Sequence, residues 1–155
     1  MKSTTSTKLL ATMLATLVIG VSAASAATTL PSSQNFAGIE YLSGGIGQDE
    51  VQAIKGVERN WPLTLEFATK DKSRATFAAN VKVLIRNDKG HAVLEASGVG
   101  PLLLARLTPG HYSVEAHFAG KTMLQKVEVI EGHPTKAVIL WPAGTGESTP
   151  ERKAQ

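Results

Sequence analysis

The sequence predicts a mainly β protein, an antiparallel β-sandwich preceded by one helix. Three observations predict it. Short segments of alternating apolar and polar residues recur at even spacing from residue 76 to 142, and turns rich in Pro and Gly separate them. Only residues 48–59 carry apolar side chains at helical spacing, and no helix–strand alternation follows them. The chain contains no cysteine, so its core must hold without disulfides.

Residues 1–26 have the pattern of a secretory signal peptide. Lys2 and Lys8 lie ahead of an apolar stretch, and Ala-Ser-Ala at 24–26 matches the small-x-small pattern of a cleavage site. We expect cleavage there rather than an uncleaved N-terminal anchor, because no stop-transfer pattern follows. The absence of cysteine also excludes a lipoprotein anchor. The sequence therefore predicts a periplasmic or secreted protein with no transmembrane segment after cleavage.

The charge of the chain points to no polyanionic partner. Sixteen basic and 13 acidic residues give a formal charge of +3, but Lys2 and Lys8 leave with the signal peptide. The remaining 14 basic and 13 acidic residues give only +1. We therefore expect no nucleic-acid partner, since nucleic-acid binding requires a basic surface.

The segment before the sandwich is expected to be irregular at first and then to pack on it. Residues 27–35 are rich in Thr and Ser and are predicted to be disordered. Residues 36–75 are expected to supply a strand at 36–42, the helix at 48–59 and an alternating strand at 63–67.

A glycine-rich loop at 43–47 precedes the helix and raises the possibility of a phosphate site. Its spacing matches neither common phosphate-binding motif. Asp49 and Glu50 would also repel a phosphate at the helix start, whereas they suit the positive end of the helix dipole. We therefore interpret these glycines as turn and capping residues.

Within residues 76–142, the stretch 100–119 is expected to be central. It reads as two strands joined in a hairpin by a type II turn at Thr108-Pro109-Gly110. The apolar side chains Tyr112, Val114, Ala116 and Phe118 are predicted to face the core, and their polar neighbours to face water. A last strand at 137–141 precedes a tail, 143–155, that is predicted to be disordered.

Three runs within this region resemble a carboxypeptidase regulatory-like domain. They are VKVLIRNDKG from Val81, GPLLL from Gly100 and LTPGHYSVEA from Leu107. The resemblance covers residues 76–142 and implies a transthyretin-like (prealbumin-like) Greek-key β-sandwich. It also implies a secreted or periplasmic accessory module without catalytic activity. The similar hydroxyisourate hydrolases end in Tyr-Arg-Gly-Ser, whereas this chain ends Arg-Lys-Ala-Gln, so their catalytic residues do not carry over.

The sequence predicts no catalytic, cofactor-binding or metal-binding residues. There is no cysteine and no G-x-S-x-G nucleophile motif. His111, Glu115 and His117 share one predicted strand face, but only Glu115 and His117 are spaced to share an ion, and two ligands make a weak site. Met123 lies at a core position and is interpreted as packing rather than a copper ligand.

We therefore expect a non-catalytic module that contacts a protein of the cell envelope. The predicted contact elements are edge strands, at 63–67 and 137–141, with Trp141 as a possible aromatic anchor or an ordinary core residue. The alternative is a periplasmic carrier of a small ligand or metal. A site for such a function, or for catalysis, would have to be sought among the four histidines, His91, His111, His117 and His133.

Overall fold

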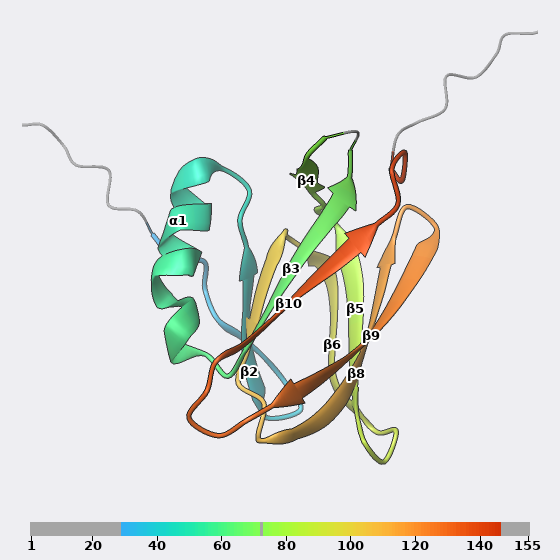
Figure 1. Ribbon diagram of the computed structural model, residues 1–155. Coiled ribbons are helices and arrows are strands. Elements are labelled where there is room, and N and C mark those ends of the chain that lie inside the picture. Colours follow the sequence, from blue (N-terminus) through green and yellow to red (C-terminus); the bar gives the residue numbers. More distant parts are fainter. Residues whose placement is uncertain (1–28, 72, 147–155) are drawn as a thin grey trace, which may run out of the picture.

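Two β-sheets packed face to face, with one helix on the outside, make up the fold (Figure 1). The computed structural model describes residues 29–71 and 73–146. Its elements are β1 (Gln34–Phe36), β2 (Ile39–Gly44), α1 (Gln48–Val57), a 3-10 turn (Glu58–Asn60), β3 (Leu63–Lys70), β4 (Ala75–Phe77), β5 (Val81–Asn87), β6 (Ala92–Val99), β7 (Leu102–Ala105), β8 (Gly110–Phe118), β9 (Lys121–Val129) and β10 (Thr135–Trp141). The β-sandwich prediction is confirmed. The expected signal peptide, and residues 147–155 of the expected tail, lie outside the described residues.

The first sheet has the order β1-β2-β7-β3-β10, and β4 pairs with the far end of β3. All its pairs are antiparallel except β3 and β10, which run parallel from Leu63↔Thr135 to Thr69↔Trp141. A parallel pair needs a long crossover connection. Here the chain between β3 and β10 forms all the strands of the second sheet before it returns to β3. The local sequence pattern of a strand does not show such a distant parallel pairing.

The second sheet has the order β6-β5-β8-β9 and is antiparallel throughout. Its β5–β6 turn is stabilised by Asn87 and Gly90. The Asn87 side chain accepts hydrogen bonds from the backbone N–H groups of Lys89 and His91, and Gly90 takes a φ of 79°. Such a left-handed residue suits glycine, because it has no Cβ.

The segment 36–75 does not pack on the sandwich as a separate addition, because its strands belong to the first sheet. β2 and β3 each pair with β7, and β3 also pairs with β10. β1 begins at Gln34, inside the stretch 27–35 predicted to be disordered, and pairs with β2. Sequence patterning missed β1 and β4 because each has three residues, too few to show alternation.

The main core lies between the sheets, and a smaller one lies under the helix. The core-facing parity of β8 is confirmed, since Tyr112, Val114 and Ala116 are buried there. On the outer face of the first sheet, Ile54 of α1 contacts a second buried cluster. That cluster contains Leu42, Trp61, Leu102 and Leu104. Fully burying a side chain of this size stabilises the fold by roughly 1.5–3 kcal/mol.

The predicted hairpin at 100–119 is wrong, because β7 and β8 belong to different sheets. All four residues of β7 are buried, as expected for a strand covered on both faces, whereas β8 alternates. The connection between them crosses from one sheet to the other. The Tyr112 hydroxyl donates a 2.6 Å hydrogen bond to the Thr108 carbonyl oxygen and so fixes this crossing, much as in the tyrosine corner of immunoglobulin domains. Gly110 has a φ of 155°, unlike the roughly +80° of a type II turn.

Candidate functional site

The polar face of β8 brings together only two of the three side chains considered as metal ligands. The Nε2 atom of His117 lies 2.8 Å from Oε1 of Glu115, and its Nδ1 lies 2.7 Å from the Thr122 hydroxyl. His111 instead faces Glu128 on β9, with Nε2 and Oε1 4.0 Å apart. Both nitrogens of His117 therefore have protein partners, and the two histidines belong to separate contacts.

The remaining histidines lie in two connections, the β5–β6 turn and the segment that crosses from β9 to β10 in the other sheet. His91 follows the β5–β6 turn and is exposed. His133 follows β9, where its Nδ1 lies 3.1 Å from the Glu131 carbonyl oxygen. Over residues 29–71 and 73–146, no group of three His, Cys, Asp or Glu side chains is placed to hold one metal ion. Met123 is partly buried and packs against the main core, as its interpretation as a packing residue requires.

The glycine loop before α1 is held by the helix's own acidic side chain. Glu50 Oε2 accepts a 3.0 Å hydrogen bond from the backbone N–H of Ile46. Gly45 and Gly47 have positive φ angles of 101° and 109°. The carboxylate thus occupies the place where an anion would meet the loop, which agrees with the interpretation of these residues as a turn and a cap.

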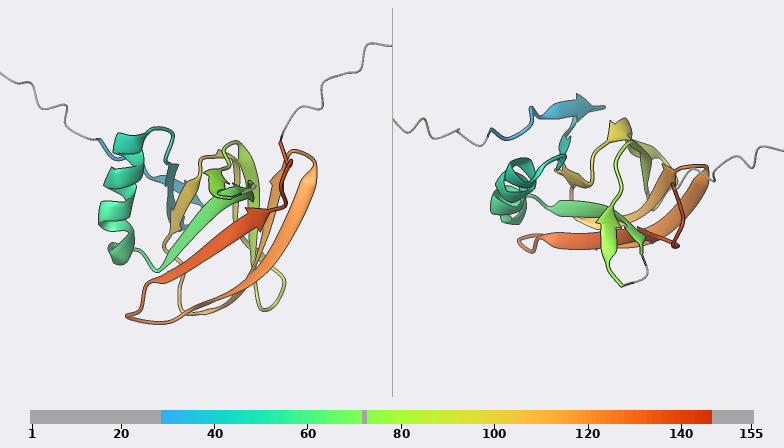
Figure 2. Two further views of the ribbon diagram at one scale, coloured as in Figure 1. Left: turned by 45° about the horizontal axis from the view of Figure 1, so that its top comes forward. Right: turned by 90° about the horizontal axis from the view of Figure 1, so that it is seen from above.

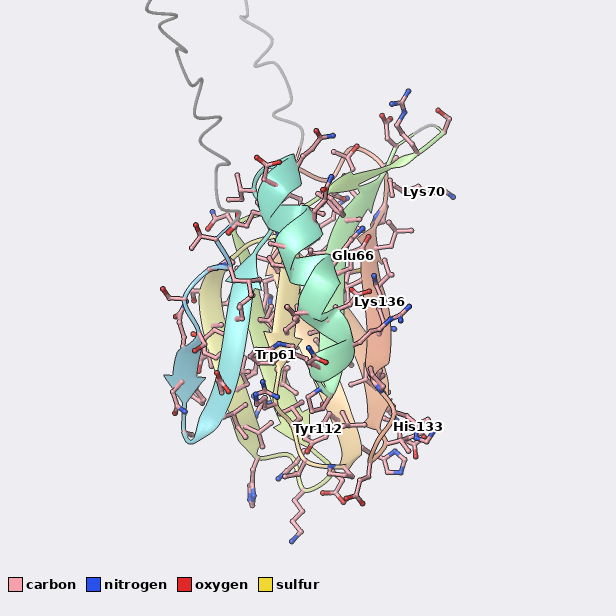
Figure 3. All side chains as sticks on the ribbon, turned by 90° about the vertical axis from the view of Figure 1, so that its left-hand side faces the viewer. Trp61, Glu66, Lys70, Tyr112, His133 and Lys136 are labelled. Atoms are coloured by element: carbon pink, nitrogen blue, oxygen red, sulfur yellow. The ribbon has the colours of Figure 1, made fainter. Side chains whose placement is uncertain are left out.

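A cleft of about 300 Å³ lies at the end of the sandwich where the chain crosses between the sheets. One wall carries Trp61, over whose ring the Arg106 guanidinium lies 4.2 Å from the centroid. Arg106 Nε is 2.7 Å from Glu40 Oε2, and its Nη1 donates to the Asn60 carbonyl oxygen at 3.2 Å. Figure 3 shows Trp61 and His133 toward the same end of the molecule. Arg106 is thereby fixed on three sides.

The cleft combines apolar walls with a few charged groups. Besides Trp61 and Arg106, it is lined by Pro62, Leu107, Pro109, Val129, Ile130 and Pro134, with Arg59, Glu131 and His133 among its charged or titratable groups. This is the composition of a small-ligand site. Sequence reasoning named His133 only as one of four histidines among which a site could be sought. It missed Trp61 and Arg106, which lie 45 positions apart in the chain. Arg106, directly after the apolar run of β7, was the only local signal.

Apart from the three-residue β4, which pairs only with the end of β3, the described sheets end in four edge strands. Three of these four carry features that discourage further pairing. β1 has only three residues. β6 has two irregularities in its register with β5. β9 carries Lys121, Lys126 and Glu128. β10 differs from all three, because its seven residues pair with β3 in unbroken register and Lys136 is its single charge.

Of the two predicted edge strands, one is confirmed and the other is wrong. β10 is at the edge of the first sheet (Figure 2), whereas β3 lies between β7 and β10. Trp141 is fully buried, and its indole N–H donates a 3.1 Å hydrogen bond to the Lys121 carbonyl oxygen. It is thus a core residue that joins β10 to β9, and the possibility of an exposed aromatic anchor is excluded.

Lys136 forms a small ionic cluster at the start of β10. Its Nζ lies 3.3 Å from Glu66 Oε2 and 3.4 Å from Glu58 Oε2. Partial burial alone would lower the pKa of Lys136, but the hydrogen bonds and charges of Glu66 and Glu58 outweigh it and raise the pKa above 10.5. The cluster links β10, β3 and the end of α1, and Figure 3 shows Glu66 and Lys136 beside the helix.

Comparisons with known proteins give no family for this chain. No protein-family model matches it, and no curated protein matches it significantly. Among solved structures it is similar to a minor pilin of Streptococcus agalactiae, with a TM-score of 0.43 and 16% identity over 77% of this chain and 66% of that one. It is also similar to the major pilin subunit of Bacillus cereus, with a TM-score of 0.35 and 13% identity over 51% of this chain and 28% of that one. The chain therefore spans less than two thirds of either pilin, and we draw no function from these similarities.

Proposed function

We propose that this protein is a non-catalytic interaction module of the cell envelope, and that β10 is its contact element. The observation that carries the proposal is the contrast among edge strands. β1, β6 and β9 are short, irregular or charged, whereas β10 is long, regular and apolar. An edge of that kind is a template for pairing with an extended segment of another chain.

The side chains of β10 suit this role. Val138 and Leu140 face outward and are 48% and 41% exposed. In strand addition, backbone hydrogen bonds supply affinity and alternate side chains supply specificity. A partner strand with apolar residues at alternate positions would bury Val138 and Leu140 while it pairs with the backbone of β10.

The compartment and family belong to the same proposal. The signal-peptide pattern of residues 1–26 supports a periplasmic or secreted location. The helices within residues 29–71 and 73–146 include none long and apolar enough to cross a membrane. The resemblance of residues 76–142 to carboxypeptidase regulatory-like domains supports an accessory role. The partner we expect is a protein of the envelope.

Site-specific cross-linking tests the proposal. A photo-reactive amino acid at Val138, in cells that produce the full chain, should capture one envelope protein. Leu140→Lys should reduce that capture at least about tenfold, because a charge would have to be buried in the new pair. The control is Leu124→Lys on β9, where the side chain is 68% exposed. Equal capture by both variants, or turnover of a substrate by the purified protein, would refute the proposal.

A second candidate function, a carrier of a small ligand, is favoured by the cleft around Trp61 and Arg106. Native mass spectrometry of protein purified from the envelope should then show a bound small molecule. Arg106→Ala should remove it, since the guanidinium covers the Trp61 ring. Protein that carries no added mass in either form would leave the interaction module as the better proposal.

A further inference from the structure

The outer face of the first sheet is covered on one half only. α1 packs over β2 and β7, where its Ile54 meets Leu42, Leu102 and Leu104. Seen from that side, the helix lies over one part of the sheet, and β3 and β10 continue beyond it (Figure 3). We define the open half as the outward side chains Ala68, Phe77, Val138 and Leu140. The outward pair Glu66 and Lys136 of the same strands borders it.

These side chains form a continuous apolar surface. Phe77, Ala68 and Leu140 are direct neighbours in one row across β4, β3 and β10, and Val138 lies in the next row. Phe77 is 43% exposed, and the small side chain of Ala68 between Phe77 and Leu140 is buried. The surface is therefore a contiguous patch rather than scattered exposed residues.

The sequence of β10 is typical of a strand whose two faces are both buried. Residues 137–141, Ala-Val-Ile-Leu-Trp, are apolar at every position. A continuous apolar run is typical of a strand buried on both faces, whereas a half-exposed strand alternates. β7 has such a run and is buried on both faces. β10 has the run, but within the described chain only its inner face is covered.

The dimensions of the open half fit a helix. Strands lie about 4.8 Å apart, so a helix about 10 Å across covers roughly two of them. α1 occupies the width of β2 and β7. The width of β3 and β10 thus matches one more helix beside α1, at the usual interaxial distance of about 8–10 Å. Such a helix would cover the end of these strands near Phe77 and Leu140 and border the cluster of Lys136, Glu58 and Glu66.

The charges at the rim of this surface indicate what that helix carries. Lys55 of α1 has its Nζ 5.8 Å from the Phe77 ring centroid, and Lys70 ends β3 on the outward side. Neither ammonium group pairs with a carboxylate among the described residues, whereas Lys136 lies between Glu58 and Glu66 in a cluster with a net charge of −1, away from Phe77. The rim near Phe77 is therefore positive and unpaired, so acidic residues complement it.

We infer that the open half binds an amphipathic helix of another protein, with an apolar stripe on Ala68, Phe77, Val138 and Leu140 and acidic residues facing Lys55 and Lys70. The inference goes beyond the proposed function. It shares contact without chemistry, but it places a helix on the outer face of β3 and β10, whereas the proposed function places a strand at the edge of β10. Apolar side chains of that helix bury the surface as α1 buries Leu102 and Leu104. The acidic residues orient the helix and exclude basic competitors.

Synthetic peptides of about 18 residues, roughly five helical turns, test this inference with the full mature chain. One peptide has leucines on one face flanked by glutamates, and a matched peptide has lysines in place of the glutamates. The glutamate peptide should bind at least about tenfold more tightly. Phe77→Ser should abolish its binding, and the matched Leu124→Ser on the second sheet should not.

Reversing the charge of Lys55 and Lys70 provides a second test of the peptide preference. The double variant Lys55→Glu/Lys70→Glu should reverse the preference between the two peptides. The control Lys89→Glu/Lys126→Glu changes the net charge equally on the second sheet and should leave the preference as it was. Unchanged circular dichroism will show that all variants fold. Equal binding of both peptides, or binding that survives Phe77→Ser, would overturn the inference.

The same variants separate this inference from the proposed function. If Phe77→Ser leaves envelope cross-linking at Val138 intact while Leu140→Lys abolishes it, strand addition at β10 stands and the helix site is refuted. Sedimentation of the full mature chain as a dimer that Phe77→Ser dissociates would also refute it, because the occupant would be a second copy.

Discussion

β7 and β10 are strands of one sheet with nearly the same kind of sequence, but they differ in what covers them. All four residues of β7 are buried, because the second sheet lies on one side and α1 on the other. In β10, Ala137, Ile139 and Trp141 are buried, while Val138 and Leu140 are exposed. A continuous apolar run therefore indicates that both faces of a strand are suited to burial. In the described chain both faces of β7 are buried, but only one face of β10 is.

The largest expected effect compares two leucines on the outer face of the first sheet. Leu104→Ala should cost roughly 2–5 kcal/mol of unfolding free energy, because it leaves a cavity under α1. Leu140→Ala should cost less than about 1 kcal/mol, since its side chain is 41% exposed in the free protein. Urea denaturation midpoints check the contrast. Similar losses for both would mean that the open half is already covered in the free protein.

The crossing that leaves β7 provides an intermediate effect. Tyr112→Phe removes the hydroxyl that donates to the Thr108 carbonyl oxygen, and it should cost about 1 kcal/mol. The matched change is Tyr41→Phe, where the hydroxyl donates to the side chain of Gln34, the first residue of the short β1. Its cost should be smaller, because β1 is mostly exposed. A larger loss of unfolding free energy for Tyr41→Phe than for Tyr112→Phe would show that the connection between β7 and β8 depends on other contacts.

A smaller effect should appear on the open side of β10. Val138→Thr keeps the β-branched shape and adds a hydroxyl at an exposed position, so the unfolding free energy should change by less than about 0.5 kcal/mol. The equivalent polar change at a covered position, Leu102→Thr, is expected to be far more costly. Thermal unfolding of the two variants gives the ranking, and a loss at Val138 as large as that at Leu102 would contradict an open face.

The smallest effect is expected from Lys136. Its pKa is raised in the folded protein, so the ionic cluster stabilises the fold fully below pH 10.5 and is lost as the pH rises through the folded pKa. Stability should therefore fall slightly in that alkaline window, and Lys136→Met should flatten the fall. Denaturation midpoints at several alkaline pH values measure it. An identical pH profile of stability in Lys136→Met would show that the ionic cluster does not contribute to the alkaline loss of stability.

Much of the fold could be predicted because it rests on local patterns. Alternation placed the inward residues of β8 correctly, and β10 could be recognised as an edge strand at the end of the β series. The hairpin at 100–119 could not be ruled out locally, since Pro109 and Gly110 suit a tight turn as well as a crossing between sheets. In the sequence, the signal against a hairpin was the continuous apolar run Leu-Leu-Leu-Ala of β7, because a strand of a half-exposed hairpin alternates.

The candidate sites depend on contacts between distant parts of the chain. Arg106 meets Trp61 and Glu40 only because β7 lies beside β2 and β3. Phe77 joins Leu140 through the parallel pairing of β10 with β3. Neither juxtaposition has a period or spacing in the sequence, so single-sequence reasoning could name the strands but not the surfaces they form.

The parallel pairing of β3 with β10 also sets the order in which the fold can be completed. It joins Leu63 to Thr135, so the loop that must close contains all four strands of the second sheet. Such a distant pairing forms late, because loop-closure entropy is lost before any contact compensates it. Until then, the apolar edge of β3 stays open to other chains. A newly synthesised molecule is thus most prone to aggregate just before its last strand docks, and chains truncated ahead of Thr135 should remain in that state.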